Sequence, residues 1–287
     1  MRYVLRWSAA LSQQETDSLT GMTEPRVLTE IDGPIAYVWL NRPDKLNGVD
    51  LELITELIAA AEALKTNRDI RAVVLQGKGR SFCAGLDFGA AFKDKKRVAR
   101  FFFAGPRSLN RFQKVTAIWR SLPVPVIAVV HGHCYGAGLQ LAVGADFRFT
   151  TPDATWSILE AKWGLVPDMA GTVPFNELLP ADVVMRLSMT GEPITGARAA
   201  ELGLATEVSD EPLKAALALV DQIVERSPDS VAATKKLIYG NRHRSVRGAY
   251  RLERKLQSAM FKARNTTIAR KAGTAKETPV FGPRTFD

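Results

Sequence analysis

Short apolar segments alternate with helical patterns over the first two thirds of the chain, whereas helical patterns alone fill the last third. The short segments are rich in β-branched residues and are bounded by glycine or proline, which is typical of buried strands. Strands are expected at 26–31, 35–40, 72–75, 126–130, 147–150 and 155–158. This order predicts an α/β body that ends in a helical region.

Helical patterns occupy most of the segments between and after these strands. Asp50 can cap a helix that runs to about Lys65, and Pro123 ends a helix that begins near Ser108. A helix of small residues begins at about Ala137. In the last third, helices are expected at 181–189, 197–202, 212–226, 230–239 and 246–264.

Three regions follow from this order. Residues 1–21 are expected to form a loose N-terminal extension. Residues 22–209 form the expected α/β body, and residues 210–287 form the helical region. A chain of 287 residues can bury a full core without disulfides. Its two cysteines, Cys83 and Cys134, form no disulfide framework, which favours a reducing, cytoplasmic location.

The net charge of +9 is concentrated near the C-terminus. From Lys235 to Asp287 there are 14 basic and 3 acidic residues, a net +11, so the rest of the chain carries −2. Such a region could meet nucleic acid, an acidic partner or the phosphates of a ligand, or it could form a solvated helical face. No apolar run approaches the ~20 residues that span a bilayer, so no membrane contact is expected.

A glycine-rich segment, Gly77 to Asp87, directly follows the strand expected at 72–75. It is not a dinucleotide-binding fingerprint, because Phe82 stands where the third glycine is required, and it is not a phosphate-binding P-loop. It offers a tight turn with exposed backbone N–H groups around 84–86. Taken alone, it would be an ordinary turn between a strand and a helix.

A second segment leads from the strand at 126–130 through glycines into the helix of small residues. The helix N-terminus, with free N–H groups and the positive end of its dipole, then faces whatever lies beyond the strand. Such a group of N–H donors is suited to bind an oxyanion. An alternative is a nucleophile elbow over Gly132 to Gly136, with Cys134 as the nucleophile. That hypothesis requires a later histidine, and only His243, set among arginines, is present.

Two carboxylates, Glu160 and Asp168, flank a turn that contains Gly164 and Pro167. Near a pocket, such a pair could move protons. Structural roles are also open: Asp168 could cap the helix that follows it, and Glu160 could pair with Lys162 or a nearby arginine.

These three segments, together with Asn41 to Asn47, closely resemble the crotonase family, the enoyl-CoA hydratases and isomerases. The motifs occur in family order and spacing over about residues 27–209. They are N-R-P-x-x-x-N, F-C-A-G-x-D, H-G-x-x-x-G-x-G-x-x-L-A, E-x-x-x-G-L-x-P and T-G-A-R-A-A-E-L-G-L. Each motif is weak alone, whereas the ordered set is highly specific.

The resemblance implies a fold, a substrate class and a set of contacts. The family fold is a spiral of ββα units, and its C-terminal helices build a trimer that is often paired into a hexamer. Members act on acyl-CoA thioesters, as in the β-oxidation of fatty acid metabolism, so coenzyme A is part of the substrate and no separate cofactor or metal is expected. By motif position, the oxyanion hole consists of the backbone N–H groups of Leu86 and Ala137. The implied contacts with coenzyme A are Lys45, Leu46, Ala84, Gly85, Asp87 and Gly136.

The acids at the family's catalytic positions bear on the reaction. Hydratases of the family use two glutamates; the second is Glu160 here, but the first falls on Gln140, which cannot exchange protons near pH 7. Asp168 matches an aspartate of the Δ3,5-Δ2,4-dienoyl-CoA isomerase branch. We therefore expect C=C isomerisation in which Glu160 moves protons, Asp168 serves the far end and Gln140 orients the substrate. The alternative is a 2-enoyl-CoA hydratase that uses Glu160 and a water held by Gln140.

Functions of other classes remain as alternatives. The basic C-terminus could bind RNA, but its aromatic residues do not alternate regularly with the basic ones, so nucleic-acid binding is not expected. An acyl-CoA-binding protein without turnover is a further alternative. Phe101 to Phe103 and Trp119 could line an acyl pocket, although an aromatic cluster at this place is more often core.

Overall fold

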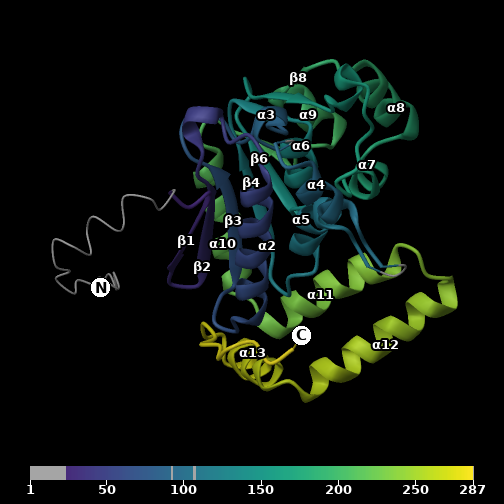
Figure 1. Cartoon of the computed structure of the whole chain (residues 1–287). Helices are drawn as coiled ribbons and strands as arrows, with labels where there is room; N and C mark the ends of the chain where they lie inside the picture. The colour runs from purple at the N-terminus through teal and green to yellow at the C-terminus, as the bar shows by residue number, and fades with distance from the viewer. Residues whose placement is uncertain (1–23, 92, 106–107, 287) are drawn as a thin grey trace, which may run out of the picture.

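A computed structural model describes residues 24–91, 93–105 and 108–286 of the chain (Figure 1). The extension expected over residues 1–21 lies outside the described residues. A six-stranded sheet in the order β1-β2-β3-β4-β6-β9 forms the centre of the body. Its strands are β1 (Val27–Asp32), β2 (Ile35–Leu40), β3 (Ala72–Gly77), β4 (Val126–Val130), β6 (Phe147–Thr150) and β9 (Glu207–Val208).

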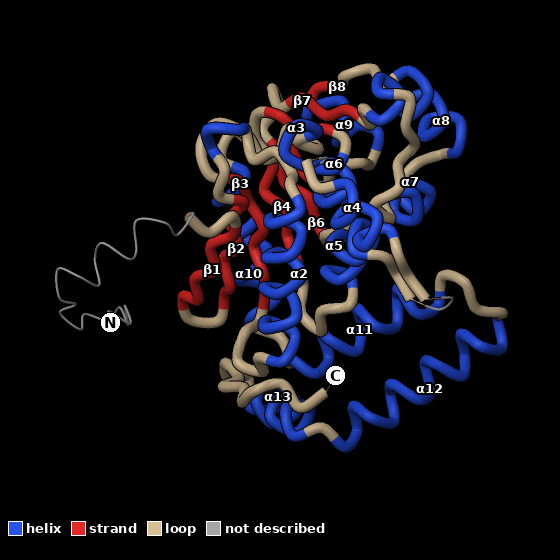
Figure 2. Tube along the Cα trace, viewed as in Figure 1, coloured by secondary structure: helices blue, strands red, loops and turns tan. Residues whose placement is uncertain are grey.

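The hairpin prediction is confirmed, because β1 and β2 pair antiparallel from Val27 with Leu40 to Asp32 with Ile35. From β2 to β9 all pairs are parallel. A second, three-stranded sheet consists of β5 (His133–Tyr135), β7 (Thr155–Ser157) and β8 (Ile194–Thr195). It lies at the end of the main sheet where the parallel strands finish (Figure 2).

Helices cover both faces of the main sheet. On one face the larger core includes α2 (Leu51–Thr66), α5 (Arg111–Arg120) and α6 (Ala137–Val143). On the other face α10 (Pro212–Val224) places Ala216 and Val220 against β3, β4 and β6. The remaining helices of the described body are α3 (Phe88–Ala91), α4 (Lys95–Phe102), α7 (Thr172–Leu178), α8 (Ala181–Thr190) and α9 (Gly196–Leu202), with short 3-10 turns η2 (Pro43–Lys45) and η3 (Glu160–Trp163).

Three further helices, α11 (Pro228–Asn241), α12 (Val246–Lys262) and α13 (Arg264–Ala275), follow the body, and α12 and α13 lie beyond it (Figure 1). The sequence predicted one helix over 246–264. Ala263 has an extended backbone, with φ −75° and ψ 134°, and therefore separates two helices. No helix within the described residues is both long and apolar enough to cross a membrane.

One helix start differs from its prediction for a local reason. The helix expected from Ser108 begins at Arg111, because Asn110 caps it. The Asn110 side chain accepts a hydrogen bond from the Gln113 N–H, and the Gln113 side chain accepts one from the Asn110 N–H. This reciprocal capping box satisfies two N–H groups that would otherwise lack partners.

A buried ion pair fastens α11 to the body. Lys235 Nζ donates to Asp146 Oδ2 at 2.6 Å and to the carbonyl oxygens of Val124 and Trp119 at 2.9 and 3.1 Å. Tyr239 Oη donates to Asp146 Oδ1 at 2.7 Å. The pair lies between the start of β4 and the helix, so the C-terminal helices are tied to the sheet through it.

We expect Lys235→Ala to lower the free energy of unfolding by about 3–5 kcal/mol, because it leaves Asp146 buried without its cation. Chemical denaturation followed by circular dichroism measures the change. Lys255→Ala is the matched control, since Lys255 is an exposed lysine of α12 and should change stability by no more than about 0.5 kcal/mol. Equal stability of the two variants would contradict the anchoring role.

Candidate active site

Two loops that follow β3 and β4 are held side by side by backbone hydrogen bonds. The N–H of Phe82 donates to His131 O at 2.8 Å, and the N–H of Cys83 donates to His133 O at 2.9 Å. Tyr135 N–H donates back to Cys83 O at 3.0 Å. The two loops therefore run in a fixed register, with Cys83 paired to Cys134.

Leu86 and Ala137 each lie three residues after one of these cysteines, and Ala137 is the first residue of α6. The backbone N–H groups of both residues have no hydrogen-bond acceptor in the described part of the chain. The flanking groups of Leu86 are engaged by Val49, whose N–H donates to Gly85 O and whose O accepts from the Asp87 N–H. Both N–H groups are thus left available, and both residues line one cleft.

Glycine permits the close approach of these loops. Gly85 has φ +95°, and a Cβ there would lie 2.9 Å from Tyr135 O and 3.9 Å from Ala137 N. Gly136 caps α6 with φ +48° and ψ −115°. Side chains at these two positions would be strained or would crowd the opposite loop.

The cleft beside these N–H groups is mostly apolar. Its side-chain walls come from both loops, from η3 and from the segment before α7. The lining residues are Ala84, Gly85, Leu86, Phe88, Gly136, Ala137, Leu159, Glu160, Trp163, Leu165, Asp168 and Met169. Glu160 and Asp168 are the only ionisable groups among these residues, so the sequence-predicted acids and N–H groups are brought together here.

Glu160 is a buried acid with one oxygen engaged and one free. Glu160 is the first residue of η3 and is 9% exposed. Oε1 accepts a hydrogen bond from Gln140 Nε2 at 2.6 Å, whereas Oε2 has no partner within the described residues. Burial, above all, raises the pKa of Glu160, and the nearby charge of Asp168 raises it further. The interpretation of Glu160 as a partner of Lys162 is wrong, since its polar contact is with Gln140.

Gln140 is held entirely by the protein. Its Oε1 accepts hydrogen bonds from the N–H groups of Met169 and Gly171 at 2.9 and 3.1 Å, and its Nε2 donates to Glu160. The side chain is 1% exposed and does not line the cleft. Gln140 therefore joins η3 to the segment that carries Asp168.

Asp168 is an exposed residue of the cleft lining. Partial burial of its carboxyl group raises the pKa of that group. The interpretation of Asp168 as a helix cap is wrong. Helix α7 begins four residues later, at Thr172, and its N-cap is Gly171. Ala170, with φ +65°, turns the chain between Asp168 and this helix.

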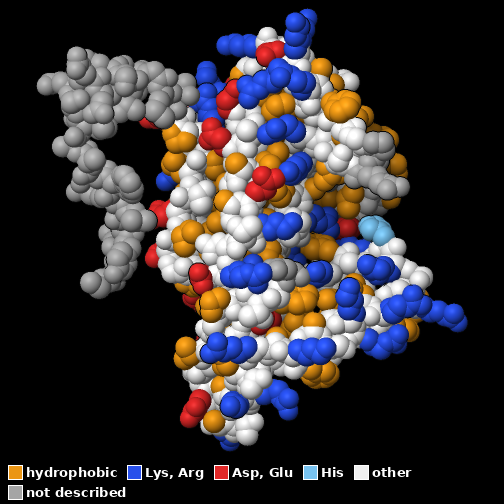
Figure 3. Space-filling view, turned by 60° about the horizontal axis from the view of Figure 1, so that its bottom comes forward, with side chains coloured by type: hydrophobic (Ala, Val, Ile, Leu, Met, Phe, Trp, Pro, Cys, Tyr) orange, Lys and Arg blue, Asp and Glu red, His pale blue; other side chains and the backbone are white. Residues whose placement is uncertain are grey.

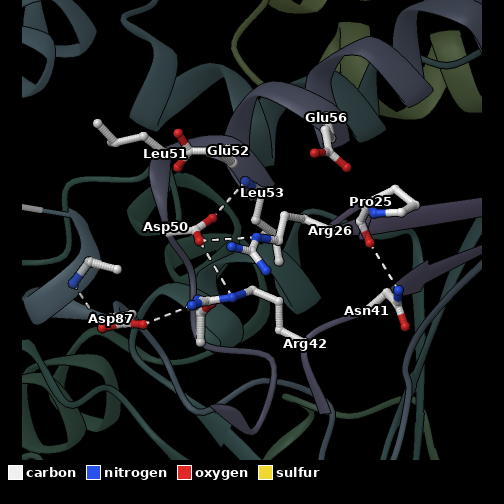
Figure 4. Close-up of polar contacts among 12 residues, drawn as sticks. Pro25, Arg26, Asn41, Arg42, Asp50, Leu51, Glu52, Leu53, Glu56 and Asp87 are labelled. Atoms are coloured by element: carbon white, nitrogen blue, oxygen red, sulfur yellow. Dashed lines mark hydrogen bonds and ion pairs between the residues drawn. The ribbon is translucent and has the colours of Figure 1, made fainter. Parts of the chain in front are cut away.

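Of the residues expected at coenzyme A, Ala84, Gly85 and Gly136 line this cleft, whereas Lys45 and Asp87 border a neighbouring pocket. Leu46 has a left-handed backbone with φ 49°, and its O accepts from the Ala84 N–H at 2.9 Å. Asp87 Oδ2 accepts from Arg42 Nη2 at 3.0 Å (Figure 4). Although burial alone would raise the pKa of Asp87, the hydrogen bonds from the Ala90 N–H and Arg42 lower it.

Arg42 organises this part of the site and was not singled out as a candidate from the sequence. Its guanidinium lies between Asp50 and Asp87, and Nη1 donates to Gly48 O (Figure 4). Asp50 caps α2 by accepting from the Leu53 N–H at 2.8 Å and also pairs with Arg26. The arginine of the N-R-P motif was the signal that could have identified it.

Several other sequence candidates lie away from the cleft. Cys134 is completely buried, which raises the pKa of its thiol well above the usual value, and His243 is exposed in the turn after α11. The structure therefore does not support the nucleophile elbow. Trp119 is a core side chain, and Phe101 packs edge-to-face on Phe112 with ring centroids 5.7 Å apart.

The spiral of parallel strands and the cleft between its two loops define an α/β enzyme of the crotonase class. A family model described as Enoyl-CoA hydratase/isomerase matches residues 30–282, and the chain belongs to this family. The prediction of family and fold is therefore confirmed.

Individual relatives agree in class. A carnitinyl-CoA dehydratase of Salmonella arizonae is 34% identical over 233 residues, which cover 80% of this chain and 86% of the relative. An (E)-benzylidenesuccinyl-CoA hydratase of Thauera aromatica is 30% identical over 213 residues, covering 73% of this chain and 80% of the relative. The crystal structure of an enoyl-CoA hydratase of Mycobacterium smegmatis matches with a TM-score of 0.81 and 26% identity, covering 90% of this chain and 99% of that chain.

Proposed function

We propose that the protein catalyses C=C isomerisation of an enoyl-CoA thioester, with Glu160 as the group that moves the proton. The observation that carries the proposal is the free Oε2 of this buried acid, in a cleft shared with the unpartnered N–H groups of Leu86 and Ala137. A buried carboxylate with a raised pKa is suited to accept and return a proton near neutral pH.

In the proposed mechanism, Oε2 of Glu160 takes a proton from C2 of a 3-enoyl thioester. The electron pair of the broken C–H bond moves toward the thioester carbonyl, and negative charge develops on its oxygen. The N–H groups of Leu86 and Ala137 donate to that oxygen, and one such donor is worth on the order of 3 kcal/mol. Glu160 then returns the proton to C4, which leaves a 2-enoyl thioester and restores the carboxylate.

Gln140 supports a mechanism in which Glu160 moves the proton at C2. Both of its polar atoms are engaged by protein groups, and it cannot donate or accept a proton near pH 7. In this proposal it positions Glu160 by fixing Oε1, instead of contacting the substrate. Asp168 serves the far end of a longer conjugated system, as in a 3,5-dienoyl thioester.

Hydration is the second candidate, and the names of the relatives favour it. The Salmonella arizonae and Thauera aromatica proteins are a dehydratase and a hydratase, both named for CoA thioesters. In such a reaction Glu160 alone would activate the water that adds to C3 and would return its proton to C2.

The contacts with coenzyme A and with other subunits are part of the same proposal. Lys45, Leu46, Ala84, Gly85, Asp87 and Gly136 border the ligand. Lysine and arginine side chains are spread among apolar ones on the face that carries the C-terminal helices (Figure 3). A trimer or hexamer built through these helices would bring such cations toward the coenzyme A phosphates of a neighbouring subunit. The same proposal places the enzyme in the cytoplasm.

Ultraviolet absorbance with three substrates in separate cuvettes tests the function. We expect a 3-enoyl-CoA to gain the absorbance of a conjugated enoyl thioester, or a 3,5-dienoyl-CoA to gain a band at longer wavelength. A 2-trans-enoyl-CoA should keep its absorbance, because only hydration would remove it and an isomerase does not hydrate the double bond. Loss of signal from the 2-enoyl substrate, with no change in the other two, would contradict isomerisation and support hydration.

A further inference from the structure

We propose that the acyl group of the substrate carries a positive charge at its far end, of the quaternary ammonium type, bound by Asp168 and the aromatic pair Phe88 and Trp163. This inference rests on the proposed function, because it specifies the acyl group of the thioester that the same cleft binds. It takes the route in which Glu160 moves the proton by itself and Asp168 moves none. It follows from the charge of the cleft, its aromatic wall and the separation of opposite charges around one loop.

The charge of the cleft is one-sided. Its lining contains two carboxylates and, among the described residues, no lysine, arginine or histidine. Glu160 is 9% exposed and has one oxygen without a hydrogen-bond partner in the described chain, and Asp168 is an exposed residue of the lining. An anionic acyl group would be repelled by both acids, whereas a cation would be attracted.

An aromatic pair lies beside these acids. The rings of Phe88 and Trp163 have centroids 5.0 Å apart and planes inclined by 44°. Trp163 is 56% exposed, so part of its indole surface is open to a ligand. Aromatic faces attract cations through their quadrupole, and pairs of rings are a recognised way to bind quaternary ammonium groups.

A neutral acyl end fits these groups less well. A plain alkyl chain that covered Asp168 would remove water from a carboxylate without giving it a partner, which is unfavourable. A hydroxyl group could donate to Asp168 but would not use the aromatic pair. A trimethylammonium group satisfies the carboxylate by charge and the rings by its methyl surface.

A second pocket beside the same loop is lined by five lysine or arginine side chains and four acids. Asp87, Gly89, Ala90 and Ala91 border it, together with Lys45 and Lys93. Neither lysine makes an ion pair within the described residues. Three of the four acids, Asp50, Glu52 and Asp87, are each paired with an arginine, and the fourth, Asp94, accepts a hydrogen bond from the Arg97 N–H. A ligand that crosses the loop therefore meets cations at one end and carboxylates at the other, which suits a thioester with anionic phosphates and a cationic acyl end.

A pair of isosteric ligands tests the proposal. One is 4-(trimethylammonio)butanoyl-CoA, and the other is 5,5-dimethylhexanoyl-CoA, in which a carbon replaces the charged nitrogen. Both are saturated, so hydration and double-bond migration cannot consume them. We expect calorimetry on the wild-type protein to show at least ten-fold tighter binding of the cationic ligand.

Variants assign the effect to the cleft. Asp168→Asn and Trp163→Leu should each remove most of the preference while the affinity for the neutral ligand changes less than about two-fold. Asp153→Asn, which removes an exposed acid outside the cleft, is the matched control and should keep the full preference. Equal or tighter binding of the neutral ligand by the wild-type protein would overturn the proposal. Failure of the wild type to turn over any enoyl-CoA would instead overturn the proposed function.

Discussion

Glu160→Gln is expected to reduce turnover of an enoyl-CoA by about 10³-fold, within the range that a positioned general acid or base contributes. The amide keeps the size of the side chain but cannot accept the proton from the substrate. Steady-state kinetics by ultraviolet absorbance measures the loss. Binding of a saturated acyl-CoA, measured by calorimetry, should change by only a few-fold, because coenzyme A meets other residues.

The control for this variant is Glu207→Gln, which removes an exposed glutamate of β9 that lies outside the cleft. It should retain the wild-type rate. If Glu160→Gln kept its turnover while remaining folded by circular dichroism, the assignment of Glu160 would be wrong. If coenzyme A binding were also lost, the substitution would have disturbed the loops and not only the proton transfer.

The order of motifs along the chain was sufficient to predict which loops border the cleft. A strand that ends in glycine and is followed by a helix places N–H groups at the same edge of a parallel sheet. The two loops after β3 and β4 therefore meet, and Leu86 and Ala137 lie on one cleft. Glu160 and Asp168 were predicted as a pair near a pocket, and both line it.

The environment of Gln140 could not be predicted in the same way. Its hydrogen bonds come from the backbone N–H groups of Met169 and Gly171, and their direction depends on the left-handed turn at Ala170. A non-glycine residue with positive φ is rare and has no clear sequence signal. The same turn delays α7 to Thr172, which removes the capping role that Asp168 was expected to have.

The helical end of the chain was predicted less completely. Its earlier helices were recognised from their apolar periodicity, but the last expected helix ended at about residue 264, so α13 was not predicted. Nor does any local pattern show that Lys235 reaches Asp146, which is 89 residues earlier in the chain. Contacts of this kind depend on how elements pack and not on their own sequence.

Gln140→Glu is expected to move the acid limb of the pH profile of kcat/KM upward by at least about one pH unit, because two carboxylates this close cannot both ionise. One oxygen of the new acid would still accept from the Met169 and Gly171 N–H groups. The other would face Glu160 Oε1 across the 2.6 Å that the amide now spans. The two acids would share a proton and titrate as a pair.

In the wild-type protein the raised pKa of Glu160 already places this limb above 4.5, the ordinary value for glutamate. The base is active only when ionised, so activity is lost as the pH falls through this pKa. At a pH below the shifted limb, Gln140→Glu should therefore be about ten-fold slower than wild type and should recover at higher pH.

Gln140→Met is the control that separates the effect of adding an acid at this position from the effect of losing the hydrogen bonds of the amide. It removes the amide without adding a titrating group. Because the hydrogen bond from Gln140 lowers the pKa of Glu160, its loss should lower the rate and move the limb upward, but by less than a second carboxylate does. An unshifted limb in Gln140→Glu would mean that this side chain does not set the protonation of Glu160. A larger upward shift in Gln140→Glu than in Gln140→Met would show that an uncharged residue at position 140 keeps the pKa of Glu160 below the value that it would have beside a second carboxylate at this position.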